Sequence, residues 1–177
     1  MVRESRSPHS TPTFCVKEPN GKWRIVYAYN KLNAVTIPAQ TPILRNDVLQ
    51  NNMVDCTMYS ALDLVDGYYQ LLMRASDITL TAVSTPSGML WKWMVMPQGL
   101  SNTPETFNRL VTQRFRPHRD YAQTYFDDIF VHSRARQARL HVDNHIDHLR
   151  AVLECMSTYK LYANAFKCIL VQRRFLF

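Results

Sequence analysis

The sequence predicts an α+β protein in which an antiparallel sheet packs on helices along one side. Short apolar segments rich in β-favouring residues are separated by turn signals, as in hairpins. Two longer segments repeat their apolar residues with the period of a helix. The two kinds of segment alternate without internal repeats, which favours one mixed architecture. With 177 residues, 46% hydrophobic and 20% charged, the chain can form the core of about one domain.

The N-terminal two thirds is expected to consist mainly of strands and turns. The expected strands are residues 14–17, 23–27, 58–64, 79–85 and 90–96. Asn20-Gly21 and Pro86-Ser87-Gly88 mark hairpin turns. Residues 34–45 contain two prolines and are expected to be extended and irregular. Asp47 is expected to cap a short helix that ends near Asn52.

Two helices and a hairpin are expected in the remaining third. Thr103-Pro104-Glu105 combines a capping hydroxyl, a proline at the first helical position and an acid in the first turn. Residues 125–131 are expected to form a hairpin. The segment from His141 to Lys160 predicts an amphipathic helix. Its expected apolar stripe is Ile146, Leu149, Val152, Leu153 and Met156.

The composition favours a polyanionic partner. The net charge is +7 and the sequence pI is near 9.4, which suggests nucleic acid first and a membrane surface second. A local cluster, Arg134 to Arg139, could contact backbone phosphate or be an exposed loop. No apolar run reaches the length of a bilayer span, so we expect no membrane partner and an intracellular protein. The four cysteines lack C-x-x-C spacing, which argues against a zinc knuckle.

Tyr125-Phe126-Asp127-Asp128 places two adjacent carboxylates between apolar, β-favouring residues. Asp is depleted from strands, so the pair is expected at the tip of a tight hairpin. Neighbouring like charges repel at a partly buried site unless a cation neutralises them. The pair is therefore a candidate divalent-metal site, although a solvated turn is the simpler interpretation.

A third carboxylate, Asp63, ends the apolar segment from Ser60, where it is either a turn cap or a site residue. On adjacent strands, Asp63 and Asp127 could hold two cations ~3.5–4 Å apart, which would activate an attacking oxygen and stabilise a leaving pyrophosphate. Phosphoryl transfer depends mainly on positioning and charge neutralisation. The acids together with basic residues therefore predict a nucleotidyl transferase.

Five motifs follow one another along the chain in an order that is far more specific than any single motif. They are residues 22–25 with 31–33 (KWRI and KLN), 62–70 (LDLVDGYYQ), 95–104 with Phe107 (VMPQGLSNTP), 125–128 (YFDD) and 161–177 with Lys167-Cys168. In words and spacing they resemble the reverse transcriptase of gypsy-type long-terminal-repeat retrotransposons. The resemblance implies the fingers and palm of a right-hand polymerase, with the thumb absent.

The resemblance also implies a domain organisation. A disordered basic tail would be followed by alternating fingers and palm segments, the last of which stops before the primer grip. The expected boundaries are 1–12 for the tail, 13–57 for fingers, 58–78 for the first palm motif, 79–97 for a fingers hairpin and 98–177 for the rest of the palm. Thumb, connection and ribonuclease H segments would belong to a full-length polyprotein, so the isolated chain is expected to synthesise DNA poorly.

For the catalytic residues, the resemblance implies two Mg²⁺ ions bound by Asp63 and Asp127, with Mn²⁺ as a possible substitute. Asp128 would complete the carboxylate cluster. Lys167 would protonate the departing pyrophosphate, and Tyr125 would contact an RNA or DNA template–primer near its end. Taken singly, each of these residues also has an ordinary structural explanation.

For the dNTP substrate, the resemblance implies that Lys17 and Arg24 clamp the triphosphate, because a guanidinium fork suits phosphate. Tyr68 would lie under the deoxyribose and select dNTP over rNTP. Gln98 and Gly99 would border the nucleotide pocket. The alternatives are solvated charges on a hairpin, ordinary core aromatics and a turn.

Two departures from the family pattern lie in the fingers. Tyr27-Ala28-Tyr29-Asn30 stands where the family usually carries an acid and a basic residue, and Leu80 stands where a lysine is common. Gln98 occurs in retroviral relatives, whereas gypsy elements more often have Phe. The fingers changes leave the predicted metal ligands intact but suit a decaying mobile element.

The leading interpretation is an RNA-directed DNA polymerase of a retrotransposon polyprotein that acts in a cytoplasmic virus-like particle. Two rival interpretations remain open. One is a catalytically inactive remnant that keeps the fold and binds nucleic acid non-specifically. The other is an unrelated basic RNA-binding protein, which would need stacking aromatics on an open sheet face. His141, His145 and His148 share one helix face and could ligate zinc, but no further ligand completes the set.

Overall fold

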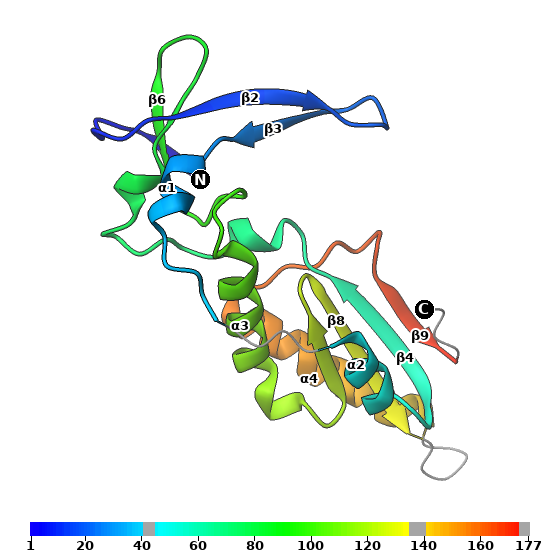
Figure 1. The fold of residues 1–177 in the computed structure, drawn as a ribbon. Coiled ribbons are helices and arrows are strands. Elements are labelled where there is room, and N and C mark those ends of the chain that lie inside the picture. The colour runs from blue at the N-terminus through cyan, green and yellow to red at the C-terminus, as the bar shows by residue number, and fades with distance from the viewer. Residues whose placement is uncertain (41–44, 135–140, 174–177) are drawn as a thin grey trace. The chain divides into compact units, whose positions relative to one another are not determined.

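The chain forms two compact units, each assembled from two separate stretches. The first unit is Met1–Gln40 with Tyr68–Pro104, and the second is Thr41–Gly67 with Glu105–Phe177. The computed structural model describes residues 1–40, 45–134 and 141–173 (Figure 1). Most of the predicted arginine cluster, beyond Arg134, and the final residues lie outside the described part.

The elements of the first unit are mostly short strands. They are β1 (Val2–Glu4), β2 (Thr11–Lys17), β3 (Trp23–Tyr27), helix α1 (Asn30–Val35), a 3-10 helix at Ile78–Thr81, β5 (Val83–Ser84) and β6 (Leu90–Trp93). A second 3-10 helix, Gly67–Gln70, begins one residue before the stretch Tyr68–Pro104 and continues into it. Helix α3 (Thr103–Phe115) begins at the end of the same stretch.

The first unit holds a five-stranded sheet in the order β1-β6-β5-β2-β3. The predicted β2–β3 hairpin is confirmed, with Lys17 opposite Trp23 and a turn closed by Gly21 at positive φ (Figure 1). The pairing of β2 with β5 is parallel, so this sheet is mixed and not purely antiparallel as expected. A parallel pair joins strands distant in sequence, which a hairpin pattern does not predict.

The N-terminal tail was predicted to be disordered, but its first residues form a strand. β1 pairs with β6 from Val2 opposite Trp93 to Glu4 opposite Trp91, and the Ser5 N–H donates to the Leu90 carbonyl at 2.9 Å. Such pairing uses backbone groups, so a polar and basic composition does not prevent it.

Two further predictions in this unit were wrong in detail. Residues 36–40 of the expected irregular segment 34–45 are irregular, but residues 34 and 35 belong to α1, and residues 41–44 lie outside the described part. The Asn33 side chain holds α1 in place by hydrogen bonds to the Gly99 carbonyl and the Ser101 N–H, both 2.9 Å. The expected strand 79–85 is a 3-10 turn followed by β5, because the Thr81 hydroxyl bonds back to the Ile78 carbonyl at 2.7 Å.

The second unit is built on a four-stranded sheet in the order β7-β8-β4-β9, and all its pairs are antiparallel, as predicted. Its elements are helix α2 (Asn46–Asn52), β4 (Cys56–Asp63), the rest of α3, a 3-10 helix at Arg116–His118, β7 (Ala122–Tyr125), β8 (Asp128–Arg134), helix α4 (His141–Tyr159) and β9 (Ile169–Gln172). Asp47 lies in the first turn of α2, and Arg45 takes the capping position that had been predicted for Asp47.

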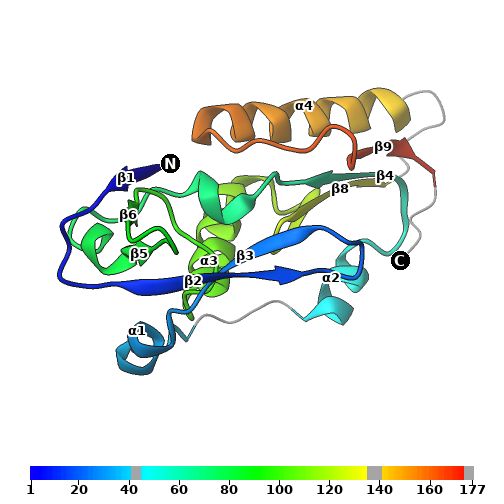
Figure 2. The ribbon, with the colours of Figure 1, turned by 90° about the horizontal axis from the view of Figure 1, so that it is seen from above.

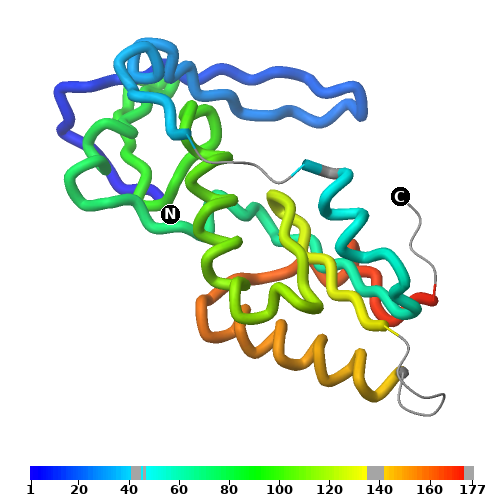
Figure 3. Tube along the Cα trace, turned by 60° about the horizontal axis from the view of Figure 1, so that its bottom comes forward, coloured from blue at the N-terminus to red at the C-terminus, as the bar shows by residue number. Residues whose placement is uncertain are grey.

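Helices α3 and α4 pack beside each other against this sheet. The Arg114 guanidinium lies 4.3 Å from the centre of the Tyr159 ring, and the Cys155 thiol lies 3.6 Å from the Arg114 carbonyl. Figures 2 and 3 show α2 and α4 on opposite sides of β4 and β8, so the helices do not all lie along one side of this sheet as predicted. The core of this unit is made from both helices and the inward residues of the strands: Leu62, Phe107, Val111, Ile129, Val131 and Val152.

The buried face of α4 differs from the predicted stripe. Leu149, Val152 and Met156 are buried as expected, but Ile146 and Leu153 are exposed at 38% and 45%. Their place on the buried face is taken by His145, which is 0% exposed. A pattern of hydrophobic residues does not identify a buried polar residue. The predicted stripe therefore included the apolar neighbours of His145 instead of His145 itself. Among the described helices none is long and apolar enough to span a membrane.

Candidate active site

Three carboxylates meet where the β7–β8 turn faces the end of β4. Asp63 is the last residue of β4 and is the register partner of Asp128, the first residue of β8. Asp127 lies in the turn, after Phe126 at φ 49°. The turn is fastened to β4 because the Leu64 N–H donates to the Asp127 carbonyl at 2.8 Å. The acids therefore lie on adjacent chain segments of one sheet, at the tip of a tight hairpin as the sequence predicts.

The electrostatics of this cluster are unfavourable for its charges. Burial, followed by the negative charges of Asp128 and Asp63, raises the pKa of Asp127 above its ordinary value. Burial and Asp63 raise the pKa of Asp128 in the same direction. The Asp127 Oδ1 atom is buried and has no hydrogen-bond partner among the described residues. A half-buried, under-satisfied carboxylate cluster is typical of sites that bind a cation.

Gly67 determines how closely the backbone approaches the carboxylates. It was not predicted as a site residue from the sequence. A Cβ on Gly67 would lie 2.5 Å from Asp127 Oδ1 and 2.6 Å from Phe107 Cζ. Only glycine therefore lets the backbone approach the carboxylate and the ring so closely. The signal was present in the Asp66-Gly67 turn, but a turn glycine alone does not tell which side chain packs against it.

Lys167 is the only sequence-predicted basic residue for which the structure records a contact with a carboxylate of this cluster, among the residues described. Its Nζ lies 3.2 Å from Asp63 Oδ2. The preceding loop is tied to β4 through Asn164, whose N–H donates to the Asp63 carbonyl at 2.7 Å and whose carbonyl accepts from the Lys167 N–H at 3.0 Å. The Lys167 side chain is 64% exposed, so the ion pair is screened by solvent.

The predicted triphosphate clamp belongs to the first unit. Lys17 is exposed at the end of β2, and Arg24 lies in β3. The Arg24 guanidinium donates to Gln98 Oε1 at 2.8 Å, which brings together two of the predicted substrate-binding residues. Gly99 follows at φ 96°, where a Cβ would come within 3.1 Å of the Tyr27 carbonyl.

Tyr68 and Tyr125 have different surroundings. Tyr68 is half-buried in the 3-10 helix that begins at Gly67. Tyr125 ends β7 and packs edge-on against Phe126, with ring centres 4.8 Å apart. Lys17, Arg24, Tyr68, Gln98 and Gly99 thus belong to one unit, and Tyr125 belongs with the carboxylates and Lys167 to the other.

The carboxylates suit a hard divalent cation in donor type. Mg²⁺ prefers oxygen ligands and is usually held by one or two carboxylates together with substrate phosphates. Within the described ranges no three side chains of His, Cys, Asp or Glu form a ready-made metal cluster. The unpartnered Asp127 Oδ1 and the register pair of Asp63 with Asp128 nevertheless offer oxygens to an ion that arrives with a phosphate.

Two histidines of the predicted face of α4, His145 and His148, make hydrogen bonds within the protein, and the side chain of the third, His141, lies outside the described part. His145 Nε2 lies 2.8 Å from Ser60 Oγ, and its Nδ1 lies 2.8 Å from Ser133 Oγ. His148 Nδ1 also lies 2.8 Å from Ser133 Oγ, and its ring stacks on Tyr121 at 4.0 Å. Both ring nitrogens of His145 are therefore used, which removes it as a zinc ligand.

Comparisons with known proteins agree with the sequence motifs. Residues 16–177 match the family model for reverse transcriptase (RNA-dependent DNA polymerase). The Pol polyprotein of the Drosophila melanogaster transposon 297 is 33% identical over 174 residues, 95% of this chain and 16% of the polyprotein. That of the transposon opus is 34% identical over 170 residues, 93% of this chain and 16% of the polyprotein. The enzymatic polyprotein of Soybean chlorotic mottle virus is 30% identical over 177 residues, covering 98% of this chain and 25% of the polyprotein.

Solved structures show the same fold. A foamy viral protease–reverse transcriptase in complex with dsDNA aligns with a TM-score of 0.86 at 23% identity, covering 99% of this chain and 35% of that one. The same kind of protein in complex with an RNA/DNA hybrid gives 0.81 at 21% identity, over 96% of this chain and 22% of that one. The predicted α+β fold of polymerase fingers and palm is confirmed, and the chain spans between a sixth and a quarter of the polyproteins named above. The chain belongs to the reverse transcriptase (RNA-dependent DNA polymerase) family.

Proposed function

We propose that this chain is the polymerase part of a gypsy-type retrotransposon polyprotein and extends a primer with dNTPs along an RNA or DNA template. The observation that carries the proposal is the meeting of Asp63, Asp127 and Asp128 at the ends of β4 and β8, with raised pKa values at two of them. Carboxylates kept together at this cost need a cation to neutralise them, and family members generally use a divalent metal.

In this proposal Asp63 and Asp127 hold two Mg²⁺ ions and Asp128 completes the cluster, with Mn²⁺ as a substitute. When bound, the ions supply charge neutralisation for phosphoryl transfer. The protein's own contribution is positioning: Gly67 lets Asp127 sit close to the backbone, and the turn at Phe126 aims the two acids. Lys167, whose Nζ lies 3.2 Å from Asp63 Oδ2, would donate a proton from Nζ to the departing pyrophosphate.

The first unit would bind the incoming nucleotide. Lys17 and Arg24 carry positive charge for the triphosphate, and the hydrogen bond from Arg24 to Gln98 orients the guanidinium. Gly99 leaves room at the pocket border, Tyr68 would read the sugar, and Tyr125 of the second unit would contact the primer–template. In this assignment residues 13–57 and 79–97 act as fingers, and residues 58–78 and 98–177 act as palm.

The test is the incorporation of one labelled dTTP on poly-rA/oligo-dT in the presence of Mg²⁺. We expect incorporation by the wild-type chain and a loss of at least about 10³-fold in Asp127→Asn, because the proposed metal ligand loses its charge. Asp55→Asn is the matched control, since Asp55 is exposed and its φ of 67° suits asparagine. Equal incorporation by Asp127→Asn and wild type would refute the assignment.

An inactive remnant is the alternative, and the fingers departures favour it. Tyr27 and Tyr29 stand in the region where the family carries charges, and Tyr29 is 1% exposed with its hydroxyl donating to the Thr81 carbonyl at 2.9 Å. The region is thus used for packing. A folded chain that binds the primer–template but incorporates no nucleotide in either Mg²⁺ or Mn²⁺ would identify the remnant.

The polyprotein and the site of action form a separate part of the proposal. Sequencing the genomic DNA on both sides of the coding region tests it. An open frame that continues into primer grip, thumb, connection and ribonuclease H would support a polyprotein that acts in a cytoplasmic virus-like particle, whereas unrelated flanking sequence would contradict it.

A further inference from the structure

A second candidate site lies in the second unit, at the end of β8 remote from the carboxylates. A cavity of about 730 Å³ opens there, lined by the end of α2, the loop before β7, the end of β8 and α4. Its lining includes Arg119, Tyr121, His132, Arg134 and His148. Asp128 and Arg134 are the two ends of β8, so the strand separates Asp128 from Arg134 by about 20 Å and from His132 by about 13 Å.

The most informative residue of this cavity is His132. Its side chain is buried, with 4% of the residue exposed, yet its Nε2 atom has no hydrogen-bond partner within the described residues. The other ring nitrogen, Nδ1, lies 3.3 Å from Cys56 Sγ. A buried polar atom without a partner costs stability and is rare in folded proteins, so an unfilled hydrogen bond at a cavity wall points to a ligand.

The neighbours of His132 decide which kind of ligand would fit. Burial, Arg134, His148 and His145 lower the pKa of His132 to about 4, so the ring is neutral. Burial raises the pKa of the Cys56 thiol, which therefore keeps its proton. In the arrangement that this proposal adopts, the S–H donates to Nδ1 across the 3.3 Å between them. The ring proton then resides on Nε2, which becomes a donor in need of an acceptor.

The charges of the lining point in the same direction. Arg119 and Arg134 supply two positive charges, and Asp120 supplies one negative charge. Asp120 lies 3.9 Å from Arg119, with side chains 91% and 74% exposed, so this pair is loose. A guanidinium held only loosely is available to an oxyanion, which it can bind through two parallel N–H groups.

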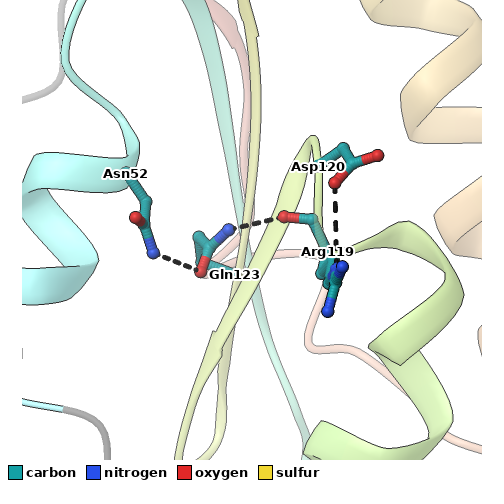
Figure 4. Close-up of polar contacts among 4 residues, drawn as sticks. All are labelled: Asn52, Arg119, Asp120 and Gln123. Carbon is teal, nitrogen blue, oxygen red and sulfur yellow. Dashed lines mark hydrogen bonds and ion pairs between the residues drawn. The ribbon is translucent and has the colours of Figure 1, made fainter.

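The backbone that carries Arg119 is fixed by a chain of side-chain contacts, shown in Figure 4. Gln123 Nε2 donates to the Arg119 carbonyl at 2.7 Å, and Asn52 of α2 donates to Gln123 Oε1 at 3.2 Å. The loop before β7 is therefore tied to both β7 and α2. The lining thus brings two guanidinium groups and an imidazole to the cavity, and these are donors for an anion.

We propose that this cavity binds a phosphoryl oxyanion through the Arg119 and Arg134 guanidinium groups and the Nε2–H of His132. Two sources share this chemistry: a free anion of the pyrophosphate type and a backbone phosphate of nucleic acid. The site is separate from the carboxylates, whose negative charge would repel the same ligand.

The test is calorimetric titration of the full chain with sodium pyrophosphate in the presence of EDTA, which keeps divalent ions from carrying the ligand to the carboxylates. We expect saturable binding that weakens about tenfold in Arg119→Gln and again in Arg134→Gln, because each loses a charge-assisted hydrogen bond. Arg150→Gln, an exposed change on α4, is the matched control and should bind as the wild type does. Absence of saturable binding, or equal affinity in all three variants, would overturn the proposal.

A second measurement reports on His132 itself and does not depend on the arginine variants folding normally. In ¹⁵N-histidine NMR spectra we expect the Nε2–H tautomer and a shift of the Nε2 resonance as pyrophosphate is added. The Nδ1–H tautomer, or a resonance that ignores the ligand, would contradict the donor role.

A competing oligo-dT identifies the source of the anion. Displacement of pyrophosphate, with an oligonucleotide affinity that falls in Arg119→Gln, would support a backbone phosphate. Pyrophosphate binding that oligo-dT leaves unchanged would support a free anion.

Discussion

Two polar clusters of the β4–β8 strand pair, the carboxylates and the His145 network, handle their polar groups in opposite ways. In the first, Asp63, Asp127 and Asp128 repel one another, and Asp127 Oδ1 lacks a partner within the described residues. In the second, Ser133 and His145 form a buried network in which their side-chain polar atoms find hydrogen-bond partners.

The contrast shows which polar cluster lowers the stability of this sheet and which one raises it. Polar groups that satisfy one another inside a protein hold one arrangement in place, whereas crowded like charges lower stability and persist where they serve binding. We therefore expect changes in the His145 network to affect folding, and changes in the carboxylates to affect activity more than folding.

His145→Ala should give the largest loss of stability. The imidazole connects Ser60 on β4 to Ser133 on β8, and its removal leaves a cavity and two hydroxyls with fewer partners. We expect a loss of about 3 kcal/mol in the free energy of unfolding, measured by urea denaturation. Ile146→Ala, next to it but 38% exposed, should cost less than about 1 kcal/mol. If the two variants unfold at the same urea concentration, the network does not stabilise the sheet.

Gly67→Ala should lower both stability and activity, because its Cβ would overlap Asp127 Oδ1 and Phe107 Cζ. We expect a loss of about 2 kcal/mol from overpacking, together with a fall in nucleotide incorporation of at least about tenfold. Gly21→Ala meets nothing within 4 Å and should cost only its backbone strain, about 1 kcal/mol, with activity kept. Partial recovery of incorporation in Gly67→Ala/Phe107→Leu would show that crowding is the cause, and a fully active Gly67→Ala would disprove the crowding.

Acid should weaken the part of β8 that carries His132. The pKa of His132 is lowered to about 4 in the folded protein, below its ordinary value, so the unfolded chain binds the proton first. The contribution of neutral His132 to the free energy of unfolding is complete above the ordinary pKa of histidine and is lost as the pH falls toward 4. Between pH 7 and 5 we expect this free energy to fall by about 1–2 kcal/mol. Urea denaturation across this range measures it. In His132→Asn the same pH change should have a smaller effect, and an equal slope would exclude His132 as the source.

Asp127→Asn should act in the opposite direction on stability. Removing one of three crowded charges relieves repulsion, and we expect a gain of about 1 kcal/mol in EDTA, a value reduced for screening by solvent. Thermal melting of this variant beside Asp55→Asn measures the gain. A less stable Asp127→Asn would mean that the carboxylate makes favourable contacts that outweigh the repulsion.

Lys167→Ala should have the smallest effect on folding. Its ion pair with Asp63 is mostly exposed, so we expect less than about 0.5 kcal/mol by urea denaturation. Its effect on incorporation should be larger than its effect on stability, and the reverse order would make Lys167 a structural residue.

Local signals in the sequence predicted the elements that place the carboxylates. A short apolar segment predicted β4, the helix-start pattern at Thr103-Pro104-Glu105 predicted α3, and the acidic pair between apolar runs predicted the β7–β8 turn. In each case the deciding interaction lies within a few residues along the chain. The meeting of Asp63 with Asp128 could be expected because adjacent strands bring their ends together.

Interactions between distant residues could not be predicted in this way. β1 depends on backbone pairing with β6, and α1 depends on the contacts of Asn33 with Gly99 and Ser101. The fit of Gly67 against Asp127 and the core position of His145 are likewise set by partners far along the chain. Periodicity and capping patterns contain no information on contacts between residues far apart in the chain. The positions of β1, α1, Gly67 and His145 therefore depend on tertiary partners that these patterns do not reveal.

The chain passes between its two compact units three times, after Gln40, Gly67 and Pro104. During synthesis, β4 therefore leaves the ribosome some sixty residues before its pairing partner β8, and the first unit cannot close until Pro104 has emerged. Recombination between related elements meets the same constraint. A single crossover between residues 41 and 104 divides both units between the two parents, so exchanging one whole unit requires three junctions.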